Sequence, residues 1–300
     1  MRHILSIQGG GIRGIIPCLA LSELEGQLGG LTRDHIDLCA GTSTGALLTA
    51  CVAAGISASA ALKVYTERGP DIFSPQSDFS RRVKLIADGH MFDNKILHQV
   101  VLDTLGAAAG MKINDCPIRV LITAVDMAGK RWFFVRDNPK NAQTTGKYPL
   151  VDAAVASACA TTYHGPWIVP GSGFFFDGGT GGLADPIYHA AVEAFYYDDF
   201  VPPETQIVNL GTGSYAPATM PNPPTNLLDN ISWVTSSLVS GSKSEAEETV
   251  DRHWPGITQS FNPEIPSEID EADVASIPKL LEIGKAAASK IDWKTVLKDK

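Results

Sequence analysis

Basic residues and long apolar runs are both scarce in this sequence. Its 300 residues include 24 Lys+Arg against 33 Asp+Glu, which gives a formal net charge of −9. Binding to nucleic acid needs a cluster of basic side chains that displaces counterions from the phosphates. This sequence has few basic residues to form such a cluster. The most apolar stretches, around residues 46–56 and 150–160, fall short of the roughly 20 apolar residues that span a bilayer. We therefore expect no nucleic-acid polymer as a partner and no membrane-spanning helix.

Paired cysteines, metal-ligand clusters and a secretory leader are also missing. The five cysteines are odd in number and show no C-x-x-C spacing, which predicts small buried side chains rather than disulfides. No H-E-x-x-H or clustered Cys/His set occurs, so neither a metal nor an organic cofactor is expected. The apolar stretch at residues 4–7 is shorter than the core of a signal peptide, which needs about 7–15 residues. These absences predict a cytoplasmic protein.

What the sequence does have is the composition of a globular chain, with 44% hydrophobic and 19% charged residues. Apolar runs of strand length alternate with helical periods through residue 213, which predicts a single α/β sheet. Residues 214–300 show polar helical patterns broken by prolines, and we expect a helical extension packed on the 1–213 core. The loosely patterned segment 69–115 is expected to form a cap. The strands are expected at 4–7, 36–40, 119–125, 131–135, 174–176 and 206–210.

A G-x-S-x-G pattern at residues 41–45 lies between a predicted strand and a predicted helix. A nucleophile on such a sharp turn has strained backbone angles, and small neighbours such as Gly41 and Gly45 avoid collision with it. Taken alone, the pattern marks an ordinary Gly/Ser-rich turn about as often as it marks a nucleophile. Ser43 is therefore a candidate nucleophile that needs support from elsewhere in the chain.

The glycine-rich loop at residues 9–14 follows the first predicted strand and opens the first helix. Its backbone N–H groups and the helix N-terminus are suited to hold an anion. A dinucleotide pyrophosphate is one option, because Gly9, Gly11 and Gly14 satisfy G-x-G-x-x-G. The oxyanion of an acyl-transfer intermediate is the other. The tip of the second strand carries Ser43 instead of an acid for a ribose hydroxyl, which favours the oxyanion.

A nucleophilic serine needs a base. The seven histidines show no distinctive local signature, and only 42 residues precede Ser43, fewer than an ordinary α/β-hydrolase places before its nucleophile. Asp177-Gly178-Gly179 directly follows a predicted strand, where α/β sheets display functional groups. A lone D-G-G is a simple turn or helix cap about half the time. Asp177 is the candidate base.

In chain order, the three motifs at 9–14, 41–45 and 177–179 resemble those of the patatin-like phospholipase family. Residues 156–163 also resemble the family's A-[ST]-S-A-A-P-x-Y segment, and residues 209–213 its S-L-G-T-G strand end. The resemblance covers roughly residues 3–213. It implies a three-layer α/β/α sandwich with a mostly parallel central sheet.

The resemblance also implies a function and a site. The chain would be a serine acyl hydrolase acting on phospholipids or lysophospholipids at the membrane surface, with Ser43 as nucleophile and Asp177 as base. The oxyanion hole would be formed by the backbone N–H groups of Gly10, Gly11 and Ile12. The supporting residues would be Gly9, Arg13, Gly14, Gly41, Gly45, Gly178 and Gly179.

Compact bacterial members of this family include antiphage effectors that a cyclic nucleotide switches on, so a cyclic nucleotide activator is a further expectation. The oligomeric state stays open, a homo-oligomer included. The rival interpretation is a non-hydrolytic nucleotide-binding module that uses the Gly9–Gly14 loop. A serine-reactive fluorophosphonate probe separates the two, because it labels only an activated serine.

The sequence departs from the family pattern near the expected pocket. Gln8 stands where the family often has Asp, and His164 replaces a usual phenylalanine, which bears on acyl-chain preference. The acidic chain has no electrostatic attraction to anionic membranes. Lipid contact would then come from apolar groups of the cap such as Ile72, Phe73 and Phe79. Burial of these three in the core is the equally weighted alternative.

Overall fold

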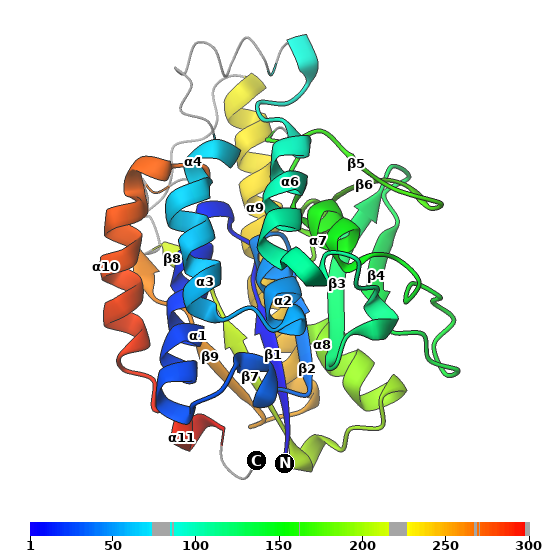
Figure 1. Ribbon diagram of the computed structural model, residues 1–300, viewed down its shortest axis with the longest axis vertical. Helices are drawn as coiled ribbons and strands as arrows, with labels where there is room; N and C mark the ends of the chain where they lie inside the picture. The colour runs from blue at the N-terminus through cyan, green and yellow to red at the C-terminus, as the bar shows by residue number, and fades with distance from the viewer. Residues whose placement is uncertain are drawn as a thin grey trace.

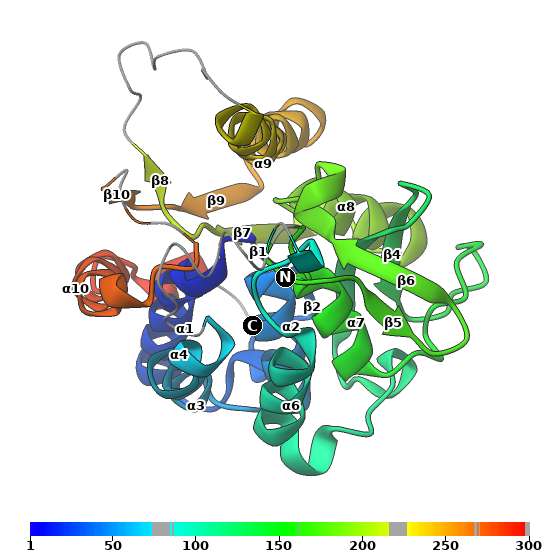
Figure 2. The same ribbon diagram turned by 90° about the horizontal axis from the view of Figure 1, so that it is seen from above.

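The computed structural model describes residues 1–73, 85, 87–161, 163–215, 227–266, 269 and 271–297. Over these residues a mixed, mostly parallel sheet is covered by helices on both faces (Figures 1 and 2). The strand order is β5-β6-β3-β2-β1-β7-β9, and β4 pairs with β3. The strands of this sheet are β1 (Arg2–Ile7), β2 (Leu38–Gly41), β3 (Arg119–Asp126), β4 (Arg131–Val135), β5 (Trp167–Val169), β6 (Gly173–Asp177), β7 (Thr205–Leu210) and β9 (Thr258–Phe261).

Two helices cover one face of the sheet and the others cover the opposite face, which gives the expected three layers (Figure 2). The first face carries α8 (Ile187–Val192) and α9 (Leu227–His253). The opposite face and its edges carry α1 (Ile15–Leu28), α2 (Thr44–Ala54), α3 (Ala58–Lys63), α4 (Gly69–Ile72), α6 (Asn94–Leu105), α7 (Leu150–Ala158), α10 (Ile277–Ala288) and α11 (Trp293–Val296). None of the described helices is both long enough and apolar enough to cross a membrane.

The central strands are buried on both faces, which explains why they appear in the sequence as unbroken apolar runs. On β1, Ile4 belongs to the core cluster beneath α8 and α9, whereas Leu5 and Ile7 belong to the larger cluster beneath α1 and α2. The five cysteines are buried and free, as their spacing predicts. The strands β1, β2, β3, β7 and β9 run parallel, so their carboxyl ends meet at one edge of the sheet.

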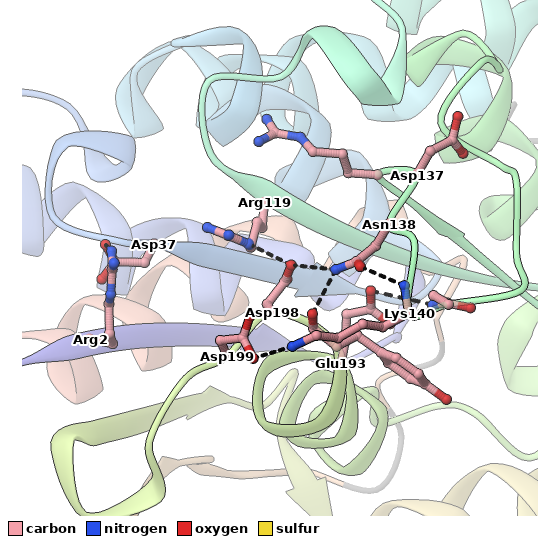
Figure 3. A network of polar contacts seen from close by, with 12 residues as sticks. Arg2, Asp37, Arg119, Asp137, Asn138, Lys140, Glu193, Asp198 and Asp199 are labelled. Carbon is pink, nitrogen blue, oxygen red and sulfur yellow. Dashed lines mark hydrogen bonds and ion pairs between the residues drawn. The ribbon is translucent and has the colours of Figure 1, made fainter.

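The opposite edge, where the parallel strands begin, is lined by polar contacts between loops (Figure 3). Arg2 pairs with Asp37 at 3.0 Å, and Arg119 pairs with Asp198 at 2.8 Å. Lys140 contacts Asp199 in the same region. These pairs are partly exposed and contribute little stability individually. The first two pairs connect the first residues of β1 and β3 to nearby loops at the amino ends of the strands.

Two parts of the fold differ from the sequence-based expectation. The run at 174–176 is expected to be a buried strand, but Phe174 is 48% exposed because β6 lies near the edge of the sheet. The tail contributes a strand as well as helices, since β9 pairs in parallel with β7. A smaller pair joins β8 (Ser214–Tyr215) to β10 (Glu264–Ile265). The division into a core and an extension stays a prediction.

Candidate active site

Ser43 lies on the turn between β2 and α2. Its backbone has φ 56° and ψ −124°, a conformation that costs a non-glycine residue about 1–3 kcal/mol. The surrounding structure holds this strain, because the Ser43 N–H donates to the buried Ser157 hydroxyl at 2.9 Å. A side chain at Gly45 would meet the Ile7 carbonyl oxygen at 2.1 Å, so the turn needs a glycine there. The geometry is that of a nucleophile elbow.

Asp177 reaches the same part of the sheet from the other side of β3. Gly41, at the end of β2, pairs with Ile122, and Asp177, at the end of antiparallel β6, pairs with Ala124. The Ser43 hydroxyl lies close enough to the Asp177 carboxylate to lower its pKa. The carboxylate accepts the Gly179 N–H at 2.7 Å, and Gly178 lies against Thr123. The structure therefore brings the two predicted catalytic residues together.

Burial makes the Asp177 carboxylate a stronger base than an ordinary aspartate. Loss of solvation raises its pKa from 3.8 to about 7, and the neighbouring Ser43 hydroxyl and the hydrogen bond from the Gly179 N–H partly oppose this shift. The nearby negative charge of Glu271 raises the pKa further, while the positive charge of Lys243 lowers it. A pKa near the working pH is what general-base catalysis requires.

The glycine-rich loop connects β1 to α1 beside this pair. The N–H groups of Gly10 and Gly11 have no acceptor among the described residues. The Ile12 N–H donates to the backbone carbonyl of Glu271 at 2.7 Å. Two of the three expected oxyanion donors are therefore open in this conformation, and the third is engaged by the C-terminal part of the chain.

Arg13 connects the glycine-rich loop to Tyr215 and Glu271. Its buried guanidinium donates to the Glu271 carboxylate at 2.5 Å, to the Tyr215 hydroxyl at 2.7 Å and to the Gly10 carbonyl at 3.3 Å. Gly14 follows and lies against Thr44 at the start of α2. Arg13 therefore ties the glycine loop to the C-terminal part of the chain, and its supporting role stays a prediction.

Asp185 is a second buried carboxylate that sequence reasoning did not select. It accepts hydrogen bonds from Gln8 at 2.6 Å and Ser6 at 3.3 Å, at the end of β1, and from Asn209 on β7 at 2.8 Å. Burial raises its pKa, and the hydrogen bond from Asn209 opposes that shift most. The sequence signal that could have identified Asp185 is Gln8. An aspartate is common at the position of Gln8 in sequences with this loop, and here Gln8 hydrogen-bonds to an aspartate instead.

An apolar pocket opens beside Ser43, between α2, α3 and α6. His164 lines it, is 3% exposed and packs against the rings of Phe73 and Phe92. Neither ring nitrogen of His164 has a hydrogen-bond partner within the described residues. Burial, more than the nearby His90, lowers its pKa to about 4, so the imidazole is neutral.

Two of the cap residues expected to meet lipid lie in this pocket instead. Ile72 and Phe73 line it and pack against the main core cluster, because α4 lies over one end of the pocket. Both side chains are half-buried, which lies between the expected exposure and the core alternative. Phe79 lies outside the described residues.

A family profile described as "Patatin-like phospholipase" matches residues 5–190, which include the elbow, the glycine loop and Asp177. The chain belongs to the patatin-like phospholipase family. Among its relatives, a cGAMP-activated phospholipase of Vibrio cholerae is 34% identical over 192 residues, covering 59% of this chain and 53% of that protein. Patatin-17 of Solanum cardiophyllum is 33% identical over 181 residues, covering 55% and 44% respectively.

The chain thus spans about half the length of these two curated relatives. Among solved structures, VipD from Legionella pneumophila matches with a TM-score of 0.48 at 10% identity, covering 98% of this chain and 67% of that one. The sequence matches alone establish membership of the patatin-like phospholipase family.

Proposed function

We propose that this chain is a serine acyl hydrolase that cleaves acyl esters of phospholipids or lysophospholipids. The observation that carries the proposal is the placement of Ser43, on its strained elbow, beside the buried Asp177 carboxylate. The adjoining pocket is lined almost entirely by apolar side chains and suits an acyl chain. Family membership supports a lipid substrate.

The geometry supports a two-step acyl transfer. Ser43 Oγ attacks the ester carbonyl carbon while its proton passes to the Asp177 carboxylate. The carbonyl oxygen becomes an oxyanion that the N–H groups of Gly10 and Gly11 stabilise. Collapse breaks the bond to the alcohol oxygen, which takes the proton from Asp177. A water then attacks the acyl-serine with Asp177 again as base, which releases the fatty acid and restores Ser43.

A fluorophosphonate probe tests this proposal against the rival nucleotide-binding module. The full chain should be labelled at Ser43, and Ser43→Ala should abolish labelling and lower acyl hydrolysis at least about 10³-fold with an unchanged melting temperature. Ser57→Ala is the matched control, because Ser57 caps α3 away from the elbow. An unlabelled but folded wild-type chain would favour the nucleotide-binding module.

We also propose that a cyclic nucleotide activates the enzyme. The support is the relative from Vibrio cholerae, described as a cGAMP-activated phospholipase. A cyclic-dinucleotide panel added to phospholipid vesicles should raise hydrolysis by the wild type and not by Ser43→Ala. The expected antiphage role would follow from such control, in a cytoplasmic enzyme that meets the membrane peripherally. Equal rates with and without every nucleotide would contradict this part alone.

A further inference from the structure

Lys243 on α9 reaches the glycine loop from the C-terminal part of the chain. Its ammonium donates to the Gly9 carbonyl at 2.8 Å and lies 3.3 Å from the Thr212 hydroxyl. Thr212 also donates to the Gly9 carbonyl, at 2.7 Å. One backbone carbonyl therefore accepts hydrogen bonds from two side chains that lie more than 200 residues away in the sequence.

The Gly9 carbonyl and the Gly10 N–H belong to one peptide group. This group is planar and trans, so the C=O and the N–H point in opposite directions. Holding the carbonyl therefore fixes the direction of the Gly10 N–H. The backbone packs closely here, since a side chain at Gly10 would meet the Thr212 hydroxyl at 2.2 Å. A cation on the carbonyl also polarises the peptide and strengthens its N–H as a donor.

We infer that Lys243 is a positioning residue for the oxyanion hole, which anchors the Gly9–Gly10 peptide so that the Gly10 N–H faces the reacting carbonyl. The inference rests on the proposed acyl-transfer function. Lys243 acts through Gly10 and does not touch the substrate. This role would link the C-terminal extension to catalysis through the position of the Gly10 N–H.

The charge on Lys243 depends on its surroundings. Burial and the neighbouring Arg13 lower its pKa, Glu271, Asp185 and Asp177 raise it, and the net value is about 8. The ammonium is therefore present below about pH 8 and is lost above it. Loss of the charge weakens the hydrogen bond to Gly9, so activity should fall on the alkaline side.

The test compares Lys243→Met, Lys243→Arg and wild type on a p-nitrophenyl ester and on lysophospholipid micelles. Lys243→Met should lower kcat about 10- to 100-fold with little change in KM, less than the loss of a whole oxyanion donor. Lys243→Arg should retain most of kcat and move the alkaline limb of the pH profile upward, because guanidinium stays charged. Lys285→Met is the control, because Lys285 is an exposed residue of α10.

Wild-type kcat in folded Lys243→Met would overturn the inference. If that variant fails to fold, Lys243→Arg decides, since an alkaline limb unchanged from wild type would also overturn it. Failure of the underlying function looks different, because the wild-type chain itself would then be inactive and unlabelled by fluorophosphonate.

Discussion

At the residue scale, the proposed chemistry depends on a carboxylate that burial has made basic. Asp177 is 5% exposed and its pKa is raised to about 7. Only the ionised form can accept the Ser43 proton, so kcat/KM should rise with pH through about pH 7, below the alkaline fall expected from Lys243. Asp177→Asn should lower kcat about 10²- to 10⁴-fold, because an amide cannot accept this proton.

Steady-state rates of both proteins between pH 5 and pH 9 check this expectation. The control is Asp71→Asn, at an exposed ion pair on α4. If Asp177→Asn kept the acid limb and the rate of the wild type, another group would be the base.

His164 is the residue whose replacement should change substrate choice more than rate. Its neutral imidazole lies in the acyl pocket without a hydrogen-bond partner among the described residues. Leaving a buried polar group unpaired costs about 1–3 kcal/mol, so a plain hydrocarbon chain meets a penalty there. His164→Phe should improve kcat/KM for long saturated chains about 10-fold and leave short p-nitrophenyl esters nearly unchanged.

A series of lysophospholipids of increasing chain length measures this effect. His164→Gln, which keeps a donor and an acceptor, is the matched variant and should behave like wild type. An equal loss on all chain lengths in His164→Phe would instead indicate a role in turnover.

At the scale of elements, the edge of the sheet that carries the site also carries exposed apolar side chains. Phe174 on β6 pairs with Ile168 on β5, and the N–H of Met127, just after β3, donates to the Phe174 carbonyl at 3.2 Å. Met127 and Ile168 are 62% and 55% exposed. A cluster of this kind favours contact with a lipid surface, and an acidic chain has no electrostatic alternative.

The double variant Met127→Asp/Phe174→Asp should therefore lower binding to phospholipid vesicles about 10-fold or more, while hydrolysis of a short soluble ester stays unchanged. Vesicle co-sedimentation measures the binding. Tyr196→Asp is the control, since Tyr196 is 65% exposed but belongs to the turn after α8 near the opposite edge. Equal binding by all three proteins would place the lipid contact elsewhere.

At the scale of the whole molecule, the C-terminal part completes both the sheet and the site. β9 covers the free edge of β7, α10 packs along α1, and Trp293 is fully buried. A fragment of residues 1–213 would expose that strand edge and the face of α1. We expect it to aggregate or to melt well below the full chain.

Thermal unfolding of the fragment and of the full chain tests this expectation. Trp293→Ala in the full chain provides a graded comparison and should cost about 3–5 kcal/mol in the free energy of unfolding. A fragment that melts cooperatively at the temperature of the full chain would show that the core folds alone.

Local sequence predicted the parts of the site that depend on neighbouring residues. The elbow at Ser43 and the loop at Gly9–Gly14 were visible because a strained turn and a cluster of N–H groups need glycines at fixed short spacings. The strands expected at 119–125 and 131–135 followed from their apolar runs in the same way and correspond to β3 and β4. These features arise from interactions within a few residues.

Only the tertiary structure showed which distant segments come together at the candidate site. No periodicity shows that β6 runs antiparallel to β3, which is what carries Asp177 to Ser43. Nor does any motif mark Asp185, Lys243 or Glu271. Their hydrogen bonds to Gln8, Gly9 and Arg13 span about 180 to 260 residues of sequence. Such contacts depend on how the chain packs, because a single lysine or glutamate leaves no repeating pattern in the sequence. The sequence alone therefore predicted the elbow that carries Ser43 and the glycine loop beside it, and only folding determined what holds them in place.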